Sequence, residues 1–240
     1  MSFERLVVTP EKWQGSKDDN SPAVRAGDLL FIASQHAIDP SEKTSAAMNA
    51  GAQGKVALER IRQIVTAAGG TMDDIVDVVA FFLDIRDAED VLEASREFFT
   101  KDYPAWTFMG TQGLPQRGSV VQIHAVAHLG KIKKQCITPE SLGWWRKYPI
   151  SGACRKGEYL FISGQMAADL DGNITNPGDH AAQSRYIFHR LEELTKLAGG
   201  NFKDDILDLL SFSIDPRSFN PMCIEVGCKE FLTMPLSSGG

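Results

Sequence analysis

The sequence has few cysteines, no long apolar run and no excess of basic residues, and each absence excludes a class of protein. The four cysteines form no C-x-x-C pair and have no histidine at metal-site spacing: Cys136, Cys154, Cys223 and Cys228. This pattern favours free thiols in a reducing cytoplasm over a disulfide framework or a zinc site. The longest apolar run, 75–83, is interrupted by Asp77 and falls short of the ~20 residues of a membrane span.

The net charge and the N-terminal sequence exclude further classes of protein. With 25 Lys and Arg against 31 Asp and Glu, the net charge is −6, so the chain has no basic footprint for nucleic acid or an anionic membrane. The start, Met1–Arg5, has no signal-peptide pattern, which indicates a cytoplasmic protein. No G-x-x-x-x-G-K-[ST] phosphate loop is present.

A stretch of the chain occurs twice, 130 positions apart. The first copy is RAGDLLFIASQ, which starts at Arg25, and the second is RKGEYLFISGQ, which starts at Arg155. A match at one fixed spacing, the repeat offset, is the signature of an internal duplication. Each copy predicts a turn at its glycine, Gly27 or Gly157, because glycine tolerates positive φ, and then a buried strand.

The first half predicts an alternation of strands and helices. The strands are expected, from β-branched content or period-2 alternation, at 6–9, 24–34, 76–83, 107–110 and 120–129. Helices are expected from Ala46 to Ala68 and from Ala88 to Phe99, where apolar residues recur at helical spacing. The pair Gly69-Gly70 ends the first helix as a C-cap would.

The second half repeats this order, with a long helix ended by Gly199-Gly200, a central strand at 206–214 and a second helix at 219–231. We therefore divide the chain into a first domain (1–131), a linker with the first strand region of the second unit (132–147), and a second domain (148–240). Counterparts of the last two strands of the first half are absent from the 240 residues. Either the natural chain is longer, or those strands are disordered, cleaved off or supplied by another chain.

Both halves resemble the Rid (YjgF-type) family, whose best-known members hydrolyse reactive enamines and imines to ketones and ammonia. The motifs that carry the resemblance are Phe161-Ile162-Ser163-Gly164-Gln165, the run 68–76, the aspartates Asp84 and Asp215 after the central strands, Glu97-Phe98-Phe99 followed by Pro104-Ala105, and the strand 122–127. Each motif is weak alone, and their order and spacing make the resemblance specific.

The resemblance implies an α+β fold with two tandem chorismate-mutase-like (Rid-type) units. Each unit would be a mixed sheet with two helices on one face, and the second would lack its last strands. Family members assemble as trimers with sites in the clefts between subunits, so the resemblance implies a homo-oligomer with trimer-like or pseudo-trimer packing. It also implies a small-molecule substrate and no cofactor, while charge and ligand spacing predict no nucleic-acid or membrane partner and no metal.

The sequence departs from the family at the positions that matter for its chemistry. The Arg that holds the substrate carboxylate in family deaminases is replaced by Trp106, which offers one N–H instead of a bidentate fork. The acid that positions the attacking water falls on Gln122, and a neighbouring acid position falls on His124. The first half has Ala33-Ser34-Gln35 where the second keeps Ser163-Gly164-Gln165. These changes place the chain with divergent subgroups of the family.

The candidate catalytic residues are Gln122, His124 and Ser163. His124 could act as an acid or base near neutral pH, or be a solvent-facing residue on an alternating strand. Ser163 could donate to the substrate or be a plain strand-end serine, and no adjacent base suggests a nucleophilic triad. A two-histidine metal site with His128 would need a third ligand, and none has matching spacing.

The candidate substrate-binding residues are Trp106, Phe108, Ser34, Gln35, Gly164, Gln165, Arg25 and Arg155. Trp106 could line the cleft or belong to the core. Gln35 and Gln165 could instead bond to a neighbouring loop. Arg25 and Arg155 could supply the missing positive charge or form surface ion pairs. We expect the two halves to share one site. Ser163-Gly164-Gln165 of the second half would meet the strands of Trp106 and of Gln122 and His124 in the first half, across a shared cleft.

Two functions remain open at this stage. The first is a cofactor-free hydrolytic deaminase of a small enamine or imine, possibly of the aminomuconate type. The second is a ligand-binding or scaffold protein that has lost catalysis, as the missing Arg and acid would allow. A ribonuclease is disfavoured by the acidic charge and by the lack of an aromatic and basic surface.

Overall fold

The computed structural model describes residues 4–11, 13, 21–37, 49–213, 215, 217, 226–227 and 229–231. The chain divides into two compact units. One unit consists of Met1–Cys136 with Lys147–Gly164, and the other of Ile137–Arg146 with Gln165–Gly240. The first unit therefore contains a segment from the second half of the sequence.

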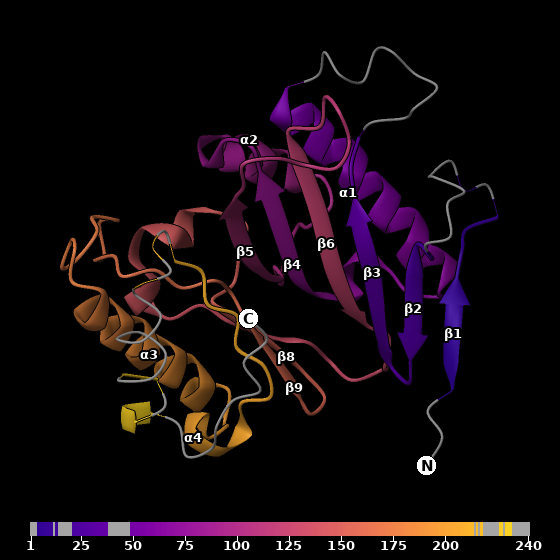
Figure 1. The fold of residues 1–240 in the computed structure, drawn as a ribbon. Helices are drawn as coiled ribbons and strands as arrows, with labels where there is room; N and C mark the ends of the chain where they lie inside the picture. Colours follow the sequence, from indigo (N-terminus) through magenta and orange to yellow (C-terminus); the bar gives the residue numbers. More distant parts are fainter. Residues whose placement is uncertain are drawn as a thin grey trace. The chain divides into compact units, whose positions relative to one another are not determined.

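The first unit is an α+β structure built on a six-stranded sheet. Its strands are β1 (Arg5–Val8), β2 (Ala23–Ala26), β3 (Leu29–Gln35), β4 (Ile75–Phe82), β5 (Ala105–Gly110) and β6 (Val121–His128). They lie in the order β1-β2-β3-β6-β4-β5, and only β4 and β5 pair in parallel. The helices α1 (Ala50–Ala67) and α2 (Ala88–Ser95) cover one face of this sheet (Figure 1).

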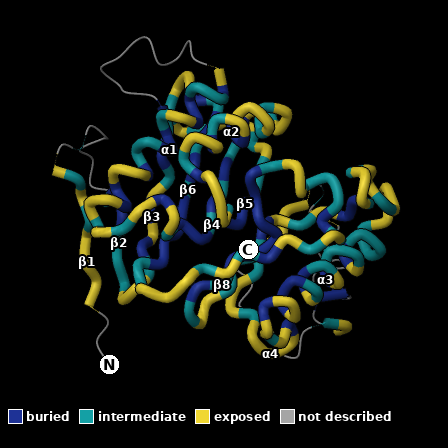
Figure 2. Tube along the Cα trace, turned by 180° about the vertical axis from the view of Figure 1, so that it is seen from behind, coloured by how far each residue is buried: buried dark blue, intermediate teal, exposed yellow. Residues whose placement is uncertain are grey.

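The core of the first unit lies between the sheet and its two helices. On β4, Val78, Ala80 and Phe82 are fully buried and alternate with half-buried neighbours. From α1, Leu58 and Ile61 are buried on the stripe that faces the sheet. In Figure 2 the central strands are dark and the edge strand β1 is exposed. The period-2 pattern on the strands and the helical stripe on α1 thus meet in one apolar layer.

A second, three-stranded sheet has the order β7-β8-β9, with β7 at Gln135–Ile137, β8 at Ala153–Lys156 and β9 at Tyr159–Ile162. The hairpin of β8 and β9 packs on the large sheet, where Cys154 forms a buried cluster with Val76 and Val126. The Lys156 ammonium lies 2.6 Å from the Asp74 carboxylate. A segment from the second half of the sequence thus completes the first unit.

The hairpins β2–β3 and β8–β9 have the same register, displaced by the repeat offset of the sequence. Ala23 pairs with Ile32, as Ala153 pairs with Ile162. Both turns use a glycine with positive φ, 61° at Gly27 and 64° at Gly157. In each hairpin an arginine donates from Nε to the carbonyl of that glycine. The distances are 2.8 Å for Arg25 and 3.3 Å for Arg155.

The long helices repeat at the same offset, since α3 (His180–Leu197) corresponds end to end with α1. Asn49 accepts a hydrogen bond from the Ala52 N–H at the start of α1, and Asp179 accepts from Ala182 at the start of α3. Such side-chain caps satisfy N–H groups that have no partner within the helix. Glycines of positive φ, Gly69 and Gly199, follow both helices, as expected.

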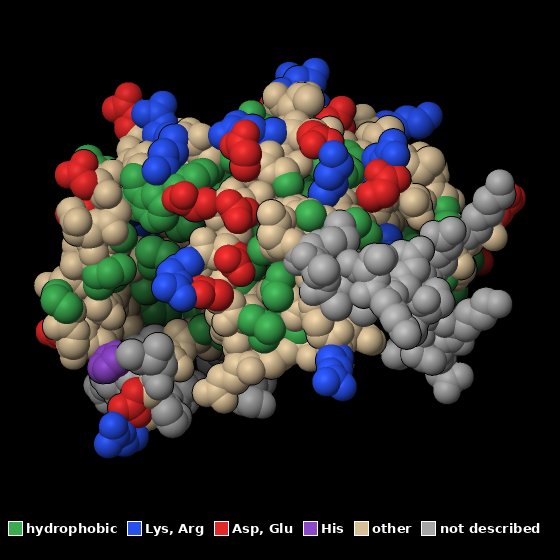
Figure 3. Space-filling view, turned by 90° about the horizontal axis from the view of Figure 1, so that it is seen from above, with side chains coloured by type: hydrophobic (Ala, Val, Ile, Leu, Met, Phe, Trp, Pro, Cys, Tyr) green, Lys and Arg blue, Asp and Glu red, His purple; other side chains and the backbone are tan. Residues whose placement is uncertain are grey.

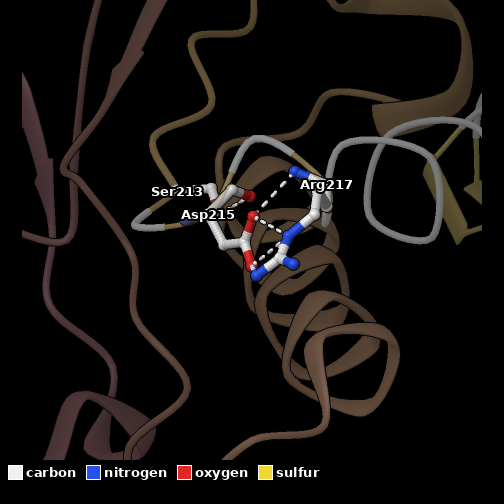
Figure 4. A network of polar contacts seen from close by, with 3 residues as sticks. All are labelled: Ser213, Asp215 and Arg217. Carbon is white, nitrogen blue, oxygen red and sulfur yellow. Dashed lines mark hydrogen bonds and ion pairs between the residues drawn. The ribbon is translucent and has the colours of Figure 1, made fainter.

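The second unit is organised around α3. Ser141, in the 3₁₀ segment Glu140–Lys147, donates its hydroxyl to the Glu193 carboxylate of α3. The short helix α4 (Phe202–Asp205) follows α3, and the ring of Phe202 meets Phe188 edge-on. Figure 4 shows Arg217 donating from its backbone N–H and its Nε to the carboxylate of Asp215.

The same Asp-x-Arg contact occurs in the first unit. Asp84 accepts from the backbone N–H and the Nε of Arg86. The pair at Asp215 and Arg217 lies one position beyond the repeat offset, as the single inserted residue after the second long helix requires. The recurrence therefore covers the glycine-turn hairpin, the long helix with its caps, and the Asp-x-Arg turn, whereas β4, β5, β6 and α2 have no counterpart in the described part of the second half.

Three sequence predictions need correction or lie outside the described residues. The segment 24–34 is a hairpin and not one strand, because Gly27 and Asp28 form a turn inside it. Residues 206–213 form no strand. A strand needs a partner for its backbone groups, and no described strand pairs with this segment. The predicted helix at 219–231 lies mostly outside the described residues.

The other predicted elements of the first half are confirmed, with shifts of a few residues at their ends. Helix α1 begins at Ala50 and α2 ends at Ser95. None of the helices in the described part of the chain combines the length and hydropathy of a membrane span.

Candidate functional site

The candidate site is the sheet face opposite α1 and α2. On β4, Val79 pairs with His124 of β6 on one side and with Thr107 of β5 on the other. In the next row, Phe81 pairs with Gln122. Residues directly opposite one another across paired strands point to the same face, so Thr107, His124 and Gln122 lie together, away from the helix-covered core.

The Ser163-Gly164 pair of the second half meets β5 at this face. The Gly164 N–H donates to the Thr107 hydroxyl oxygen at 3.0 Å and to the Trp106 carbonyl at 3.2 Å. The Ser163 hydroxyl accepts from the Trp106 N–H at 2.8 Å and donates to the carbonyl of Ser151. Gly164, Thr107 and His124 therefore occupy one line across the sheet, and buried Ser163 anchors that line to the backbone of β5.

Trp106 lies on the other face, within the core, and half-buried Phe108 shares that face. Trp106 pairs with fully buried Val78 and is itself 1% exposed. Its ring stacks on Phe108 at a centroid distance of 5.6 Å and meets Phe99 edge-on at 6.2 Å. Because side chains alternate along β5, Thr107 lies on the face that carries His124 and Gln122. Its two aromatic neighbours lie on the opposite face.

Two titratable groups share the candidate face and are perturbed by burial. Loss of hydration lowers the pKa of His124, so its imidazole is neutral at pH 7. On β4, burial raises the pKa of Asp77 to about 7, against the effect of a hydrogen bond from the Val78 N–H. Asp77 pairs with Val126, two residues along β6 from His124. A carboxyl group with a pKa of about 7 and a neutral imidazole thus lie on one face.

The remaining predicted residues are more dispersed. Ser34 and Gln35 end β3, where the Gln35 amide donates to the Ala33 carbonyl. Arg25 and Arg155 bond to the carbonyls of their own turns. Gln165 belongs to the second unit, whereas Ser163 and Gly164 belong to the first.

His128 is buried at the end of β6, and its Nδ1 accepts from the Gly130 N–H at 3.2 Å. Its ring lies 6.1 Å from that of Tyr159 in the β8–β9 hairpin. Within the described ranges, no group of three His, Cys, Asp or Glu side chains is arranged to hold a metal ion.

Sequence reasoning did not select Thr107 or Asp77 as site residues. Asp77 had a signal, because it is the charged residue inside an otherwise apolar strand. Alternation along β5 could have identified Thr107. It lies between two large aromatic residues, and alternate residues of a strand point to opposite faces. The resemblance pointed to Trp106 and Phe108 instead.

The molecular surface in Figure 3 has acidic and basic side chains interspersed over the visible face. They do not gather into a basic stripe on the described part of this face. That distribution agrees with the net charge of −6.

Comparison with known proteins places the first half of the chain in a family. The family model for endoribonuclease L-PSP matches residues 16–129. A RutC family protein of Sinorhizobium fredii, y4sK, is 32% identical over 115 residues, which cover 48% of this chain and 90% of the relative. The human 2-iminobutanoate/2-iminopropanoate deaminase is 29% identical over 131 residues, 55% of this chain and 95% of that protein.

Among solved structures, a Pseudomonas aeruginosa protein of unknown function has a TM-score of 0.49 and 24% identity, covering 53% of this chain and 94% of that one. The sequence matches define the class. The chain belongs to the Rid (YjgF-type) family, which is also the endoribonuclease L-PSP family of the matching model. One of its distant relatives in that family is an imine deaminase by name.

Proposed function

We propose that this protein is a cofactor-free hydrolytic deaminase of a small enamine or imine. Water adds to the C=N carbon, and the resulting carbinolamine loses ammonia, so that imine and water give a ketone and NH₃. The observation that carries the proposal is the line of Gly164, Thr107 and His124 across one sheet face, with a neutral imidazole at its end. Membership of a family that includes a human imine deaminase supports the reaction class.

The roles follow from the chemistry of each side chain. The neutral His124 imidazole takes a proton from the attacking water, as a base of lowered pKa can at neutral pH. Gln122, in the next row, orients that water but accepts no proton. Thr107 provides a hydroxyl for the substrate. Asp77, whose pKa is about 7, is partly protonated at neutral pH and supplies the proton that the leaving ammonia requires.

The proposed substrate class follows from Trp106, which occupies the position of the carboxylate-binding Arg of family deaminases. Trp106 is buried against Phe108 and Phe99 and contributes no positive charge to the candidate face. We therefore propose a substrate whose carboxylates are not held by a bidentate clamp at this position, and we keep an aminomuconate-type enamine as the candidate. Iminoacids that depend on such a clamp are expected to be poorer substrates.

We further propose that the chain is a tandem of two Rid-type units, with the sequence boundaries given above and an incomplete second copy. The shared repeat offset of hairpins, caps and long helices supports this. We also propose that the protein forms a homo-oligomer with trimer-like or pseudo-trimer packing. Light scattering tests the assembly, and a mass equal to the 26.3 kDa chain would contradict it.

The catalytic proposal is tested by ammonia release from a panel of iminoacids and from 2-aminomuconate. His124→Gln should reduce kcat/KM by about 100-fold, the usual size of a general-base contribution. The matched control is His189→Gln, which alters an exposed histidine of α3 and should leave the rate unchanged. Equal rates for both variants, with their folds intact by circular dichroism, would remove His124 from the mechanism.

The alternative is a ligand-binding protein without catalysis. Gln122 favours it, because an amide cannot take the proton of water at neutral pH. This alternative predicts binding of the same compounds by calorimetry with no ammonia release above buffer. Turnover that disappears in His124→Gln would exclude it.

A further inference from the structure

Two cysteines of the first unit lie in contact, and the proposed deamination uses neither. The Sγ atoms of Cys136 in β7 and Cys154 in β8 are 3.5 Å apart. Both cysteines are free. Cys154 is completely buried, while Cys136 is partly exposed. The two strands are neighbours in the three-stranded sheet.

The two thiols share a backbone acceptor. The carbonyl oxygen of Tyr103 lies 3.3 Å from Cys136 Sγ and 3.2 Å from Cys154 Sγ. Tyr103 comes two residues before β5, so its carbonyl fixes both sulfur atoms against the start of that strand. This arrangement holds the pair in mutual contact instead of leaving either side chain to rotate away.

The environment makes the two thiols unequal. The hydrogen bond from Cys154 lowers the pKa of Cys136 to about 7, and the cation of Lys134 acts in the same direction; burial and the carboxylate of Asp102 oppose them. The same contact and burial raise the pKa of Cys154. A partly exposed thiolate beside a protonated thiol is the usual arrangement of an attacking and a resolving cysteine.

We propose that Cys136 and Cys154 are a peroxide-reactive pair that closes to an intramolecular disulfide between β7 and β8. The Cys136 thiolate attacks one oxygen of hydrogen peroxide, releases hydroxide and becomes a sulfenic acid. The Cys154 sulfur, giving up its proton, then attacks the Cys136 sulfur and displaces water. In total, two thiols and one H₂O₂ give one disulfide and two waters, with the sulfurs oxidised by two electrons.

The geometry is compatible with this closure. A disulfide requires an S–S distance of about 2.05 Å, so the sulfurs need to approach by about 1.5 Å from their present contact. Rotation of the partly exposed Cys136 side chain can supply this movement. The disulfide has no S–H left to donate to the Tyr103 carbonyl, which links the oxidation state of the pair to the strand that carries Thr107.

The experiment treats the full chain with a few equivalents of H₂O₂ at pH 7 and maps its peptides without reduction. The expected result is a linked peptide pair containing Cys136 and Cys154, two hydrogens lighter than the separate peptides and released by dithiothreitol. The double variant Cys223→Ser/Cys228→Ser should give the same linked pair. Links from Cys136 to either of those residues, irreversible oxidation of Cys136 without a link, or no reaction would each overturn the proposal.

A second measurement separates the roles of the two thiols. Cys154→Ala should slow alkylation of Cys136 by iodoacetamide at pH 7 by about tenfold, because the thiolate fraction falls from about half to a few per cent. Dimedone should trap the Cys136 sulfenic acid in this variant, where no resolving thiol follows. An unchanged alkylation rate, or dimedone labelling confined to other cysteines, would contradict the assignment.

Discussion

The Lys156 ammonium lies 2.6 Å from the Asp74 carboxylate, with the lysine side chain 4% exposed. This ion pair joins the β8–β9 hairpin to the turn that precedes β4. Asp74 also accepts from the Thr71 N–H at 2.8 Å. A charge from the second half of the sequence is thus held by an acid of the first, within one compact unit.

Removing one partner of this pair should destabilise the protein. Lys156→Met leaves the Asp74 carboxylate without its cation and should lower the free energy of unfolding by roughly 2–4 kcal/mol. Lys55→Met is the control, because Lys55 forms an exposed pair with Glu97 and should cost less than about 1 kcal/mol. Urea unfolding measures both, and similar losses would show that the buried pair contributes little.

The same pair should make stability depend on acid pH. Lys156 and Thr71 lower the pKa of Asp74 in the folded state against the effect of burial. The folded protein therefore binds fewer protons here than the unfolded chain, so the stabilisation is complete above the ordinary Asp pKa and is lost as the pH falls through the folded value. Asp74→Asn should flatten this part of the curve between pH 5 and about 2.

Asp77 should change the pH dependence of stability in the opposite direction to Asp74. Its folded pKa of about 7 is raised above the unfolded value, so the folded state holds a proton that the unfolded state has lost. Stability should therefore fall as the pH rises from about 4 to about 7 and then level off. Asp77→Asn should stabilise the protein at pH 8 by about 1–3 kcal/mol, measured by urea unfolding. No gain would mean that the carboxylate is well hydrated.

Replacing Ser163 distinguishes a structural role from a catalytic one. Ser163→Ala leaves the buried Trp106 N–H without its side-chain acceptor and should cost roughly 1–3 kcal/mol. If Ser163 only anchors β5, the variant should keep its turnover at temperatures where it remains folded. Turnover that falls by about two orders of magnitude in the folded variant, with little change in stability, would instead identify a reacting hydroxyl.

The two equivalent turn glycines give a matched test of where the second hairpin packs. Gly27→Ala and Gly157→Ala both force a side chain into positive φ, which costs about 1 kcal/mol. At Gly157 the added Cβ would also come within 3.2 Å of His128 Nε2, whereas at Gly27 it would meet nothing within 4 Å. Thermal unfolding should therefore show the larger loss for Gly157→Ala. Equal losses would argue against the contact between this turn and β6.

Local features of the fold could be predicted from the sequence. The turns at Gly27 and Gly157, the apolar stripe of α1 and the glycines after α1 and α3 depend on neighbours within a few residues in the chain. Those interactions are the same wherever the segment lies in space. The two copies of the repeated sequence therefore have hairpins with the same strand register, helices with equivalent N-caps, and turn glycines with similar φ angles.

The candidate site depended on contacts between distant segments. Which face of β5 points to the helices is decided by its pairing with β4, and this places Trp106 in the core and Thr107 opposite. Tertiary pairing also explains why 206–213 forms no strand. A segment with high β-propensity becomes a strand only where a neighbouring strand pairs with its backbone.

The sequence by itself thus determined the family, through its motifs, and most local elements of the first half, because those elements follow from short-range backbone and side-chain preferences. Only the tertiary structure decided that the β8–β9 hairpin completes the first unit, brings Gly164 to Thr107 and holds Cys136 against Cys154. The contacts of Cys136 with Cys154 and of Gly164 with Thr107 join residues 18 and 57 positions apart, and the contact of Lys156 with Asp74 joins residues 82 positions apart. Their formation depends on packing and pairing energies that no local pattern encodes.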